Sequence, residues 1–184
     1  MDVNIRHLLE KMEQDKAISE VGLWNVSWEV GQFLYDTVLQ YKPKVILEVG
    51  TSNGFSALWM ASAADTYGGK FYTIDSSPKR IPLAKENFKQ SGLSNIHFIQ
   101  GHAPEIFESL PKDLKIDMAF FDGTKRQYIE FYEGLKPFFS KKAFILADNI
   151  ISHTKSLQSY LDLVRKEHES TLFSLGSGIE FTII

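Results

Sequence analysis

The sequence contains no cysteine, and this absence removes whole classes of chemistry. Disulfide bonds, thiolate metal sites, iron–sulfur clusters and a cysteine nucleophile are all excluded. Long apolar runs are missing too, since no stretch approaches the roughly 18 residues of a membrane span. The first residues also lack the apolar segment of a signal peptide, so we expect a cytoplasmic protein without a membrane partner. Its chemistry must therefore use oxygen, nitrogen or a bound cofactor.

A strong charge of either sign is also absent. The 184 residues carry 20 basic and 23 acidic side chains, which gives a formal net charge of −3. Extended binding to nucleic acid needs clustered Lys and Arg, so this balance disfavours a nucleic-acid partner but leaves room for a local basic patch. The length and the apolar content of 43% fit a single globular domain over residues 1–184.

Short runs rich in Val, Ile and Phe alternate along the chain with segments of helical spacing. This alternation is typical of a parallel sheet with crossover helices. The five apolar runs, each expected to be a strand buried on both faces, are residues 44–49, 70–75, 95–100, 116–121 and 143–147. The helices expected between and after them are residues 55–64, 82–91, 104–110, 126–138 and 154–168. The pattern predicts an α/β fold, a Rossmann-like doubly wound sheet with helices on both faces.

The two ends of the chain add further elements. Residues 171–175 and 179–184 are extended runs joined by the glycine-rich turn 176–178. They predict a C-terminal hairpin, with one strand joining the sheet antiparallel. Residues 3–16 and 29–41 are amphipathic, so we expect two amino-terminal helices that cover a face or rim of the domain. The sheet should therefore be mostly, but not wholly, parallel.

The turn after the first predicted strand contains two glycines. In an open parallel sheet, ligands bind beyond the carboxyl ends of the strands, so this turn is a candidate site. Gly50 and Gly54 let the backbone turn sharply and approach a ligand. Ser52 stands between them where a dinucleotide fingerprint has glycine, which disfavours close binding of a pyrophosphate. A tight turn that binds no ligand is an equally good interpretation of this segment alone.

Asp75 ends the second predicted strand, where an acidic residue commonly accepts hydrogen bonds from the two hydroxyls of a ribose. The alternative is that Asp75 caps the following helix. Ser76 and Ser77 already offer capping oxygens, which weakens that alternative. The position therefore favours a cofactor that carries a nucleoside.

Oxygen-bearing side chains follow the fourth and fifth predicted strands. Asp122 comes directly after the fourth, and Asp148 and Asn149 come directly after the fifth. If these strands are neighbours, two carboxylates and an amide oxygen converge, a donor set that suits Mg²⁺ or Mn²⁺. The alternative is that both aspartates cap the following helices, and for Asp148 taken alone the cap is favoured. The pair on adjacent strands favours a metal site.

In their order and spacing, these residues resemble a known family. From about Trp24 to Ile184, the chain is similar to metal-dependent O-methyltransferases, the S-adenosylmethionine-dependent class I group that includes catechol and caffeoyl-CoA O-methyltransferases. The segments that carry the resemblance are Glu48-Val49-Gly50 with Ser56, Asp75, Asp122 with Lys125 and Tyr128, and Asp148-Asn149.

The resemblance implies S-adenosylmethionine as cofactor. It implies that Gly50 and Ser56 bind the methionine part, that Asp75 holds the ribose, and that Glu48 orients its neighbours. Further residues that it places around the cofactor are Trp24, Val26, Ser52, Ser76, His102, Ala103 and Asp122. Of these, Trp24 would lie over the methyl-transfer site, and Ser76, His102 and Ala103 would line the adenine pocket.

The resemblance also implies the reaction centre. Asp122, Asp148 and Asn149 match the ligands of a divalent cation, with Mg²⁺ or Mn²⁺ as the ion, and Lys125 matches the general base. The implied reaction moves a methyl group to a metal-bound hydroxyl of a small, aromatic acceptor. The segment 170–172 has no acid where the catechol enzyme holds the second hydroxyl of its substrate, so the acceptor is not fixed as a catechol.

Two other functions stay open. Lys79, Arg80, Lys85 and Lys89 form a basic stretch that would contact phosphate in a tRNA-modifying methyltransferase. A non-catalytic adenosylmethionine-binding protein would keep the cofactor pocket without the chemistry. A homodimer through the amino-terminal helices is a further possibility.

Overall fold

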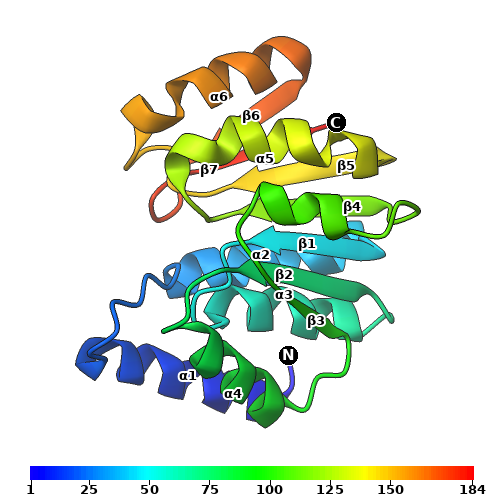
Figure 1. Ribbon diagram of the computed structural model, residues 1–184. Helices are drawn as coiled ribbons and strands as arrows, with labels where there is room; N and C mark the ends of the chain where they lie inside the picture. The colour runs from blue at the N-terminus through cyan, green and yellow to red at the C-terminus, as the bar shows by residue number, and fades with distance from the viewer.

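A single sheet forms the centre of the computed structural model, which describes the backbone of residues 1–184 and the side chains of residues 1–16 and 19–184 (Figure 1). The strands are β1 (Val45–Val49), β2 (Lys70–Asp75), β3 (Ile96–Gln100), β4 (Ile116–Phe121), β5 (Phe139–Ala147), β6 (Glu169–Phe173) and β7 (Ile179–Ile183). Their spatial order is β3-β2-β1-β4-β5-β7-β6. The pairs among β1 to β5 are parallel, whereas β7 runs antiparallel to both β5 and β6. The predicted α/β sheet with an antiparallel C-terminal hairpin is confirmed.

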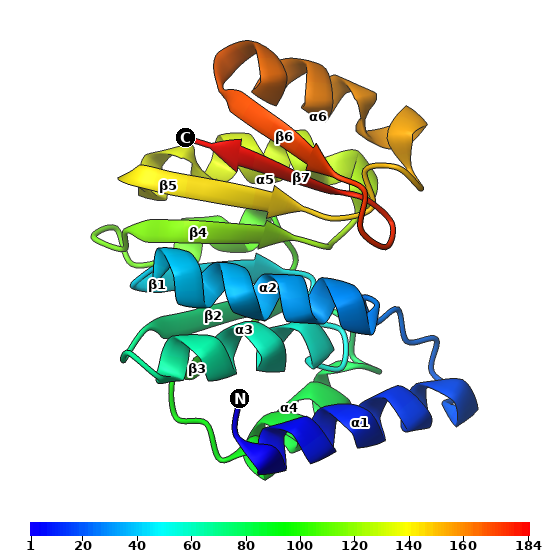
Figure 2. The same cartoon turned by 180° about the vertical axis from the view of Figure 1, so that it is seen from behind.

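Helices cover both faces of this sheet (Figures 1 and 2). The α-helices are α1 (Val3–Ile18), α2 (Trp28–Tyr41), α3 (Phe55–Asp65), α4 (Ile81–Ser91), α5 (Tyr128–Leu135) and α6 (Thr154–Glu167). One face packs against α2 and α3, and the other packs against α5 and α6. α1 packs against α3 and α4 rather than on the sheet itself. Within the described helices, none combines the length and apolar character needed to cross a membrane.

Alternation along the central strands explains the two packed layers. In β1, Ile46 faces the α2 and α3 layer while Leu47 faces the α5 and α6 layer, and both are fully buried. In β4, Phe120 and Phe121 divide between the layers in the same way. Successive side chains of a strand point to opposite faces, so a continuous apolar run supplies both cores. This is why the sequence of the central strands predicts burial on both faces.

Two expected helices differ from the prediction. Residues 104–110 form only the short 3₁₀-helix η1 (Glu105–Ser109), because Pro104 and Pro111 bracket the segment. Residues 126–138, expected as one helix, are divided into η2 (Lys125–Gln127), α5 and η3 (Lys136–Phe138). Pro137 lies in η3 and lacks the backbone donor that a longer α-helix would use.

Three strands also differ from the prediction. β5 begins at Phe139 rather than at residue 143, since the exposed Lys141 and Lys142 disguise its first half as a loop. β6 covers Glu169–Phe173 rather than residues 171–175. The expectation that all five parallel strands are buried on both faces is wrong for β3, which lies at the edge of the sheet and is half-buried to exposed.

The order of strands places the site. Neighbours β1 and β4 are not consecutive in the chain, and their crossovers leave the sheet in opposite directions. A doubly wound sheet opens a crevice at the carboxyl ends of two such strands. The turns after β1 and β4 therefore mark where a ligand should bind.

Candidate functional site

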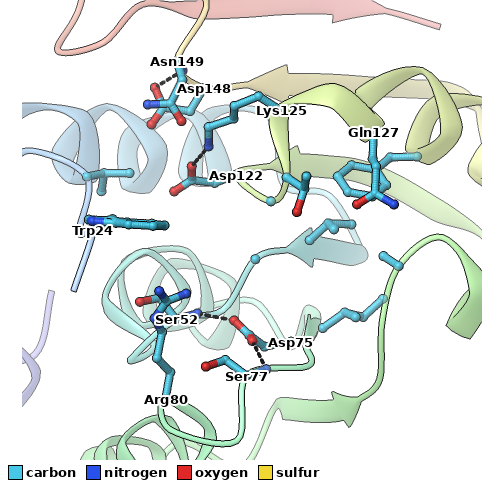
Figure 3. Close-up of a pocket in the computed structure, with 18 of the residues that line it drawn as sticks. Trp24, Ser52, Asp75, Ser77, Arg80, Asp122, Lys125, Gln127, Asp148 and Asn149 are labelled. Atoms are coloured by element: carbon cyan, nitrogen blue, oxygen red, sulfur yellow. Dashed lines mark hydrogen bonds and ion pairs between the residues drawn. The ribbon is translucent and has the colours of Figure 1, made fainter. Parts of the chain in front are cut away.

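A cavity of about 920 Å³ lies at the carboxyl ends of the parallel strands. It is lined by the turns that follow β1 to β5, by residues 24–27 between α1 and α2, and by the turn of the C-terminal hairpin. The predicted site residues that line it are Trp24, Val26, Gly50, Ser52, Asp75, Ser76, His102, Ala103, Asp122, Lys125, Asp148 and Asn149. The structure thus brings together residues predicted for a cofactor, a cation and a base (Figure 3).

Gly50 sits at the crossing point of β1 and β4. Its φ of +108° is in a region that side chains disfavour, and a Cβ there would lie 2.4 Å from the backbone oxygen of Asp122. The amide of Asp122 donates to the carbonyl of Val49 at 2.9 Å. Glycine is therefore required for the turns after β1 and β4 to approach each other this closely.

Asp75 is held against the cavity wall by two backbone amides (Figure 3). The amide of Ser52 donates to Oδ2 and the amide of Ser77 donates to Oδ1, each at 2.7 Å. Ser52 reaches this position with a φ of +52°, a left-handed conformation. Each carboxylate oxygen keeps a lone pair for a ligand, so the group is prepared to accept two hydroxyl hydrogen bonds.

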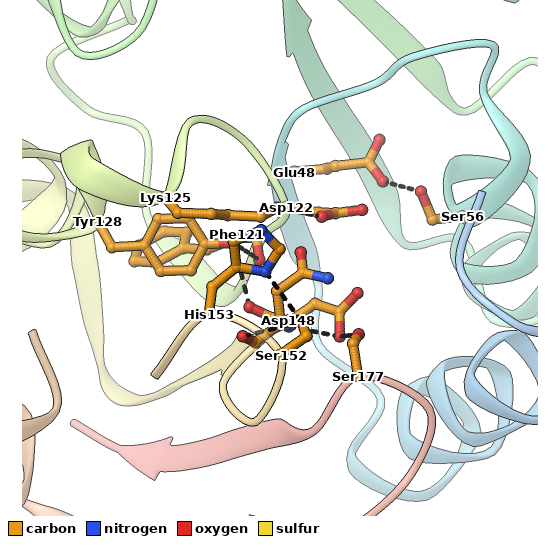
Figure 4. A network of polar contacts seen from close by, with 11 residues as sticks. Glu48, Ser56, Phe121, Asp122, Lys125, Tyr128, Asp148, Ser152, His153 and Ser177 are labelled. Atoms are coloured by element: carbon orange, nitrogen blue, oxygen red, sulfur yellow. Dashed lines mark hydrogen bonds and ion pairs between the residues drawn. The ribbon is translucent and has the colours of Figure 1, made fainter. Parts of the chain in front are cut away.

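Glu48 and Ser56 lie beneath the cavity rather than along its lining. Glu48 is fully buried and accepts hydrogen bonds from the hydroxyls of Ser56 and Thr73 (Figure 4). Burial raises the pKa of Glu48 to about 8, and the negative charges of Asp122 and Asp75 act in the same direction. The Ser56 hydroxyl, predicted to bind the cofactor carboxylate, is instead directed to Glu48.

Lys125 and Asp122 form an ion pair inside the cavity. The Nζ atom of Lys125 lies 2.8 Å from Oδ1 of Asp122, and both side chains are largely removed from solvent. Burial raises the pKa of Asp122 to about 7; the Lys125 ammonium opposes this increase, and the charge of Asp148 adds to it. The 3₁₀-helix η2 directs the lysine back over the end of β4, which explains the three-residue spacing in the sequence.

Asp148 and Asn149 follow β5 and lie beside this ion pair (Figure 3). Oδ1 of Asp148 accepts from the Ser177 hydroxyl at 2.6 Å and from the Asn149 amide at 2.7 Å. Its Oδ2 atom is left for another partner. Burial raises the pKa of Asp148 even though both hydrogen bonds lower it. Asn149 has a φ of +69°, and its side-chain oxygen is buried without a hydrogen-bond partner among the described residues.

Tyr128, the last residue of the Asp122 to Tyr128 segment, has a structural position. Its hydroxyl donates to the carbonyl of Phe121 at 2.9 Å and lies 3.2 Å from the carbonyl of Asp148. It is fully buried and therefore ties the ends of β4 and β5 together below the cavity. The spacing of the segment reflects this support as well as the chemistry above it.

The mouth of the cavity contains Trp24 and Arg80. Trp24 is 75% exposed, and the guanidinium carbon of Arg80 lies 4.8 Å from the centre of its ring. Nε of Arg80 also donates to the carbonyl of Gly22 at 3.2 Å. Next to Trp24, both amide atoms of Asn25 are buried without a hydrogen-bond partner.

Sequence analysis missed several lining residues, among them Gln127, His153 and Ser177. Ser177 lies 29 positions from the aspartate that it contacts, so no local motif marks it. Sequence analysis assigned no role to Gln127, which stands between Lys125 and Tyr128. Of the residues predicted for an adenine pocket, His102 is half exposed and its Nδ1 lies 2.7 Å from Oε2 of Glu105.

Comparisons with known proteins agree with this geometry. A family model described as O-methyltransferase matches residues 2–174. A catechol O-methyltransferase of Niastella koreensis is 32% identical over 146 residues, which cover 77% of this chain and 66% of that protein. A catechol O-methyltransferase of Mycobacterium tuberculosis is 27% identical over 127 residues, covering 68% and 57%. The chain thus spans about two thirds or less of the length of these curated relatives.

A solved structure has a similar fold. The O-methyltransferase from Bacillus cereus, crystallised in complex with SAH, aligns with a TM-score of 0.86 at 22% identity. The alignment covers 97% of this chain and 90% of that one. The fold is therefore shared with that protein over nearly the whole chain.

Proposed function

The chain belongs to the O-methyltransferase family, and from this membership and the cavity we propose that it transfers a methyl group from S-adenosylmethionine to a hydroxyl oxygen of a small, aromatic acceptor. The observation that carries the proposal is that one cavity joins the amide-bound carboxylate of Asp75 to the Asp122, Lys125 and Asp148 group. Its volume is in the range of about 300 to 1,000 Å³ typical of ligand pockets.

The cofactor end of the cavity is assigned to the turns after β1 and β2. Asp75 accepts the ribose hydroxyls, and Gly50 lines the part of the cavity that is assigned to the methionine part. Residues 24–27 close this end from the other side. Together they align the methyl donor with the polar group after β4 and β5, which is the main contribution a protein makes to such a transfer.

The donor set after β4 and β5 fits a hard divalent cation. It offers two carboxylates and an amide oxygen, and the amide oxygen of Asn149 is buried without a partner. Within the described side chains there is no cluster of three or more His, Asp or Glu that could hold a metal, so the site depends on Asn149. Asp122, Asp148 and Asn149 would hold Mg²⁺ or Mn²⁺. When bound, the ion supplies a Lewis acid that makes a nearby hydroxyl more acidic.

Lys125 is assigned to take the proton from the acceptor, a step in which the neutral amine becomes the ammonium paired with Asp122. A hydroxyl placed beside Asp122 lies within reach of Nζ, because the two residues are 2.8 Å apart at their polar atoms. Removal of the proton leaves an oxygen lone pair to attack the methyl carbon, and S-adenosylhomocysteine is the second product. Trp24 at the mouth offers an aromatic face to the ring of the acceptor.

The test measures S-adenosylhomocysteine formed from S-adenosylmethionine, Mg²⁺ and a panel of catechol and flavonoid acceptors. We expect turnover with at least one acceptor that carries neighbouring hydroxyls, and loss of turnover with EDTA or in Asp148→Ala. Calorimetry with S-adenosylhomocysteine is run in parallel. Cofactor binding without turnover on any acceptor would favour a non-catalytic binding protein, and absence of cofactor binding would overturn the proposal.

A further inference from the structure

Gln127 lies at the far side of the cavity from Trp24 (Figure 3). In that view, Asp75 and Asp122 lie between the two residues. The proposed methyl-transfer centre lies at Asp122, Lys125 and Asp148. A nucleoside held at Asp75 with its sulfur directed to that centre has room to extend its base away from it, toward the part of the cavity that Gln127 lines.

The walls at this end are apolar and suit the faces of a purine. Phe131, one helical turn after Gln127, is 1% exposed and lines the cavity. Ala103 and Ile74 line the same cavity and are buried as well. The connection after β3 lies against α5, because a Cβ at Gly134 would meet both Phe107 and Pro104. Aromatic and aliphatic side chains thus line the cavity together with Gln127.

A buried base also needs partners for its polar edge. Ala103 offers none from its side chain, and the imidazole of His102 is turned to Glu105 in a largely exposed position. The half-buried Gln127 makes no side-chain hydrogen bond to the residues whose side chains the structure describes, although its backbone amide donates to Thr124. A primary amide carries a donor and an acceptor side by side. This pair matches the 6-amino group of adenine and the ring nitrogen beside it.

We propose that the side-chain amide of Gln127 recognises the adenine base of the cofactor. Its carbonyl oxygen accepts from the 6-amino group, and its NH₂ donates to the adjacent ring nitrogen. The inference rests on the proposed function, since it needs a nucleoside at Asp75. It makes Gln127 a specificity residue, distinct from the residues that perform the transfer.

The test compares two ligands by calorimetry, S-adenosylhomocysteine and its analogue whose purine lacks only the 6-amino group. We expect the wild-type protein to bind the analogue about 2- to 12-fold more weakly, the worth of one hydrogen bond. Gln127→Ala should bind S-adenosylhomocysteine about 5- to 150-fold more weakly and should bind both ligands equally. Gln127→Met keeps the side-chain volume and should behave in the same way.

Gln158→Ala is the matched control, because Gln158 is exposed on α6 and pairs there with Asp162. It should keep the wild-type preference. Equal binding of the two ligands by the wild-type protein, or an unchanged preference in both Gln127 variants, would overturn the inference while leaving the proposed function intact. No binding of S-adenosylhomocysteine by the wild-type protein would overturn both.

Discussion

The hydroxyl of Ser177 donates a hydrogen bond of 2.6 Å to Oδ1 of Asp148, which joins the turn of the C-terminal hairpin to the end of β5. Backbone bonds reinforce the contact, since the amides of Ile150 and Ile151 donate to Gly178 and Ser177. A Cβ at Gly178 would lie 2.8 Å from the backbone nitrogen of Ile151. The hairpin turn thus fixes the direction of the aspartate and leaves Oδ2 free.

Ser177→Ala should weaken divalent-cation binding. Partners that orient a metal ligand typically contribute 10- to 100-fold to affinity, so we expect a loss of about that size. A titration with Mn²⁺ followed by electron paramagnetic resonance measures it without any turnover. Ser174→Ala, an exposed serine of the same hairpin connection, is the control and should bind like the wild-type protein. Equal affinity in Ser177→Ala would contradict an orienting role.

Lys125→Arg should abolish most of the turnover while cofactor binding persists. Arginine keeps the positive charge beside Asp122 but cannot give up its proton, so it cannot act as a base. We expect kcat to fall by about 10² to 10⁴, the range for loss of general-base catalysis. Steady-state kinetics with the best acceptor measure the loss, and calorimetry checks the cofactor. A near-normal kcat would show that another group takes the proton.

Asp75→Asn should weaken cofactor binding by about 1 to 3 kcal/mol. The backbone amides of Ser52 and Ser77 each need an acceptor, and asparagine would face one of them with its own NH₂ group. Calorimetric titration with S-adenosylhomocysteine gives the change. Asp65→Asn, at the exposed end of α3, serves as the matched control. If both variants bind like the wild-type protein, Asp75 has no part in the ribose site.

Glu48→Gln should change how stability depends on pH. Burial raises the pKa of Glu48 from 4.5 to about 8, so between these values the folded protein keeps a proton that the unfolded chain has lost. The free energy of unfolding of the wild-type protein therefore falls as pH rises through this window. At about 1.4 kcal/mol per pKa unit, the whole effect is on the order of 5 kcal/mol.

The glutamine variant cannot lose a proton at this position and should escape the decline. Urea unfolding at several values between pH 5 and pH 8 should show Glu48→Gln gaining stability relative to the wild-type protein as pH rises. The hydroxyls of Ser56 and Thr73 are available to the amide as they are to the carboxyl group. A stability difference that does not vary with pH would mean that Glu48 titrates normally in the folded state.

Sequence alone predicted the parts of the fold that local chemistry controls. The runs of β1 and β4 are apolar apart from Glu48 and Asp117, because both faces of these strands are covered. The start of β5 was missed since Lys141 and Lys142 point to solvent at the end of the sheet. The edge position of β3 follows from strand order, which no residue pattern of that strand records.

The site also contains some residues that the sequence predicts and others that it does not. Asp122, Asp148 and Asn149 could be grouped from the sequence, because turns after adjacent parallel strands share one edge. Ser177 could not, since its contact with Asp148 depends on how the hairpin docks. The direction of the Ser56 hydroxyl could not be predicted either, because it depends on the buried carboxyl group of Glu48, eight residues away. Contacts between distant segments carry the information that local patterns lack.

Arg80 resting on Trp24 ties the α1–α2 connection to the start of α4 on one side of the opening. An exposed contact of this kind is worth only about 0.5 to 1 kcal/mol, close to thermal energy. The hydrogen bond from Nε of Arg80 to the carbonyl of Gly22 adds about 0.5 to 1.5 kcal/mol, so we still expect the tie to break and re-form without a trigger. Ligand entry and release on this side of the opening should therefore be governed by diffusion rather than by a slow rearrangement of the protein.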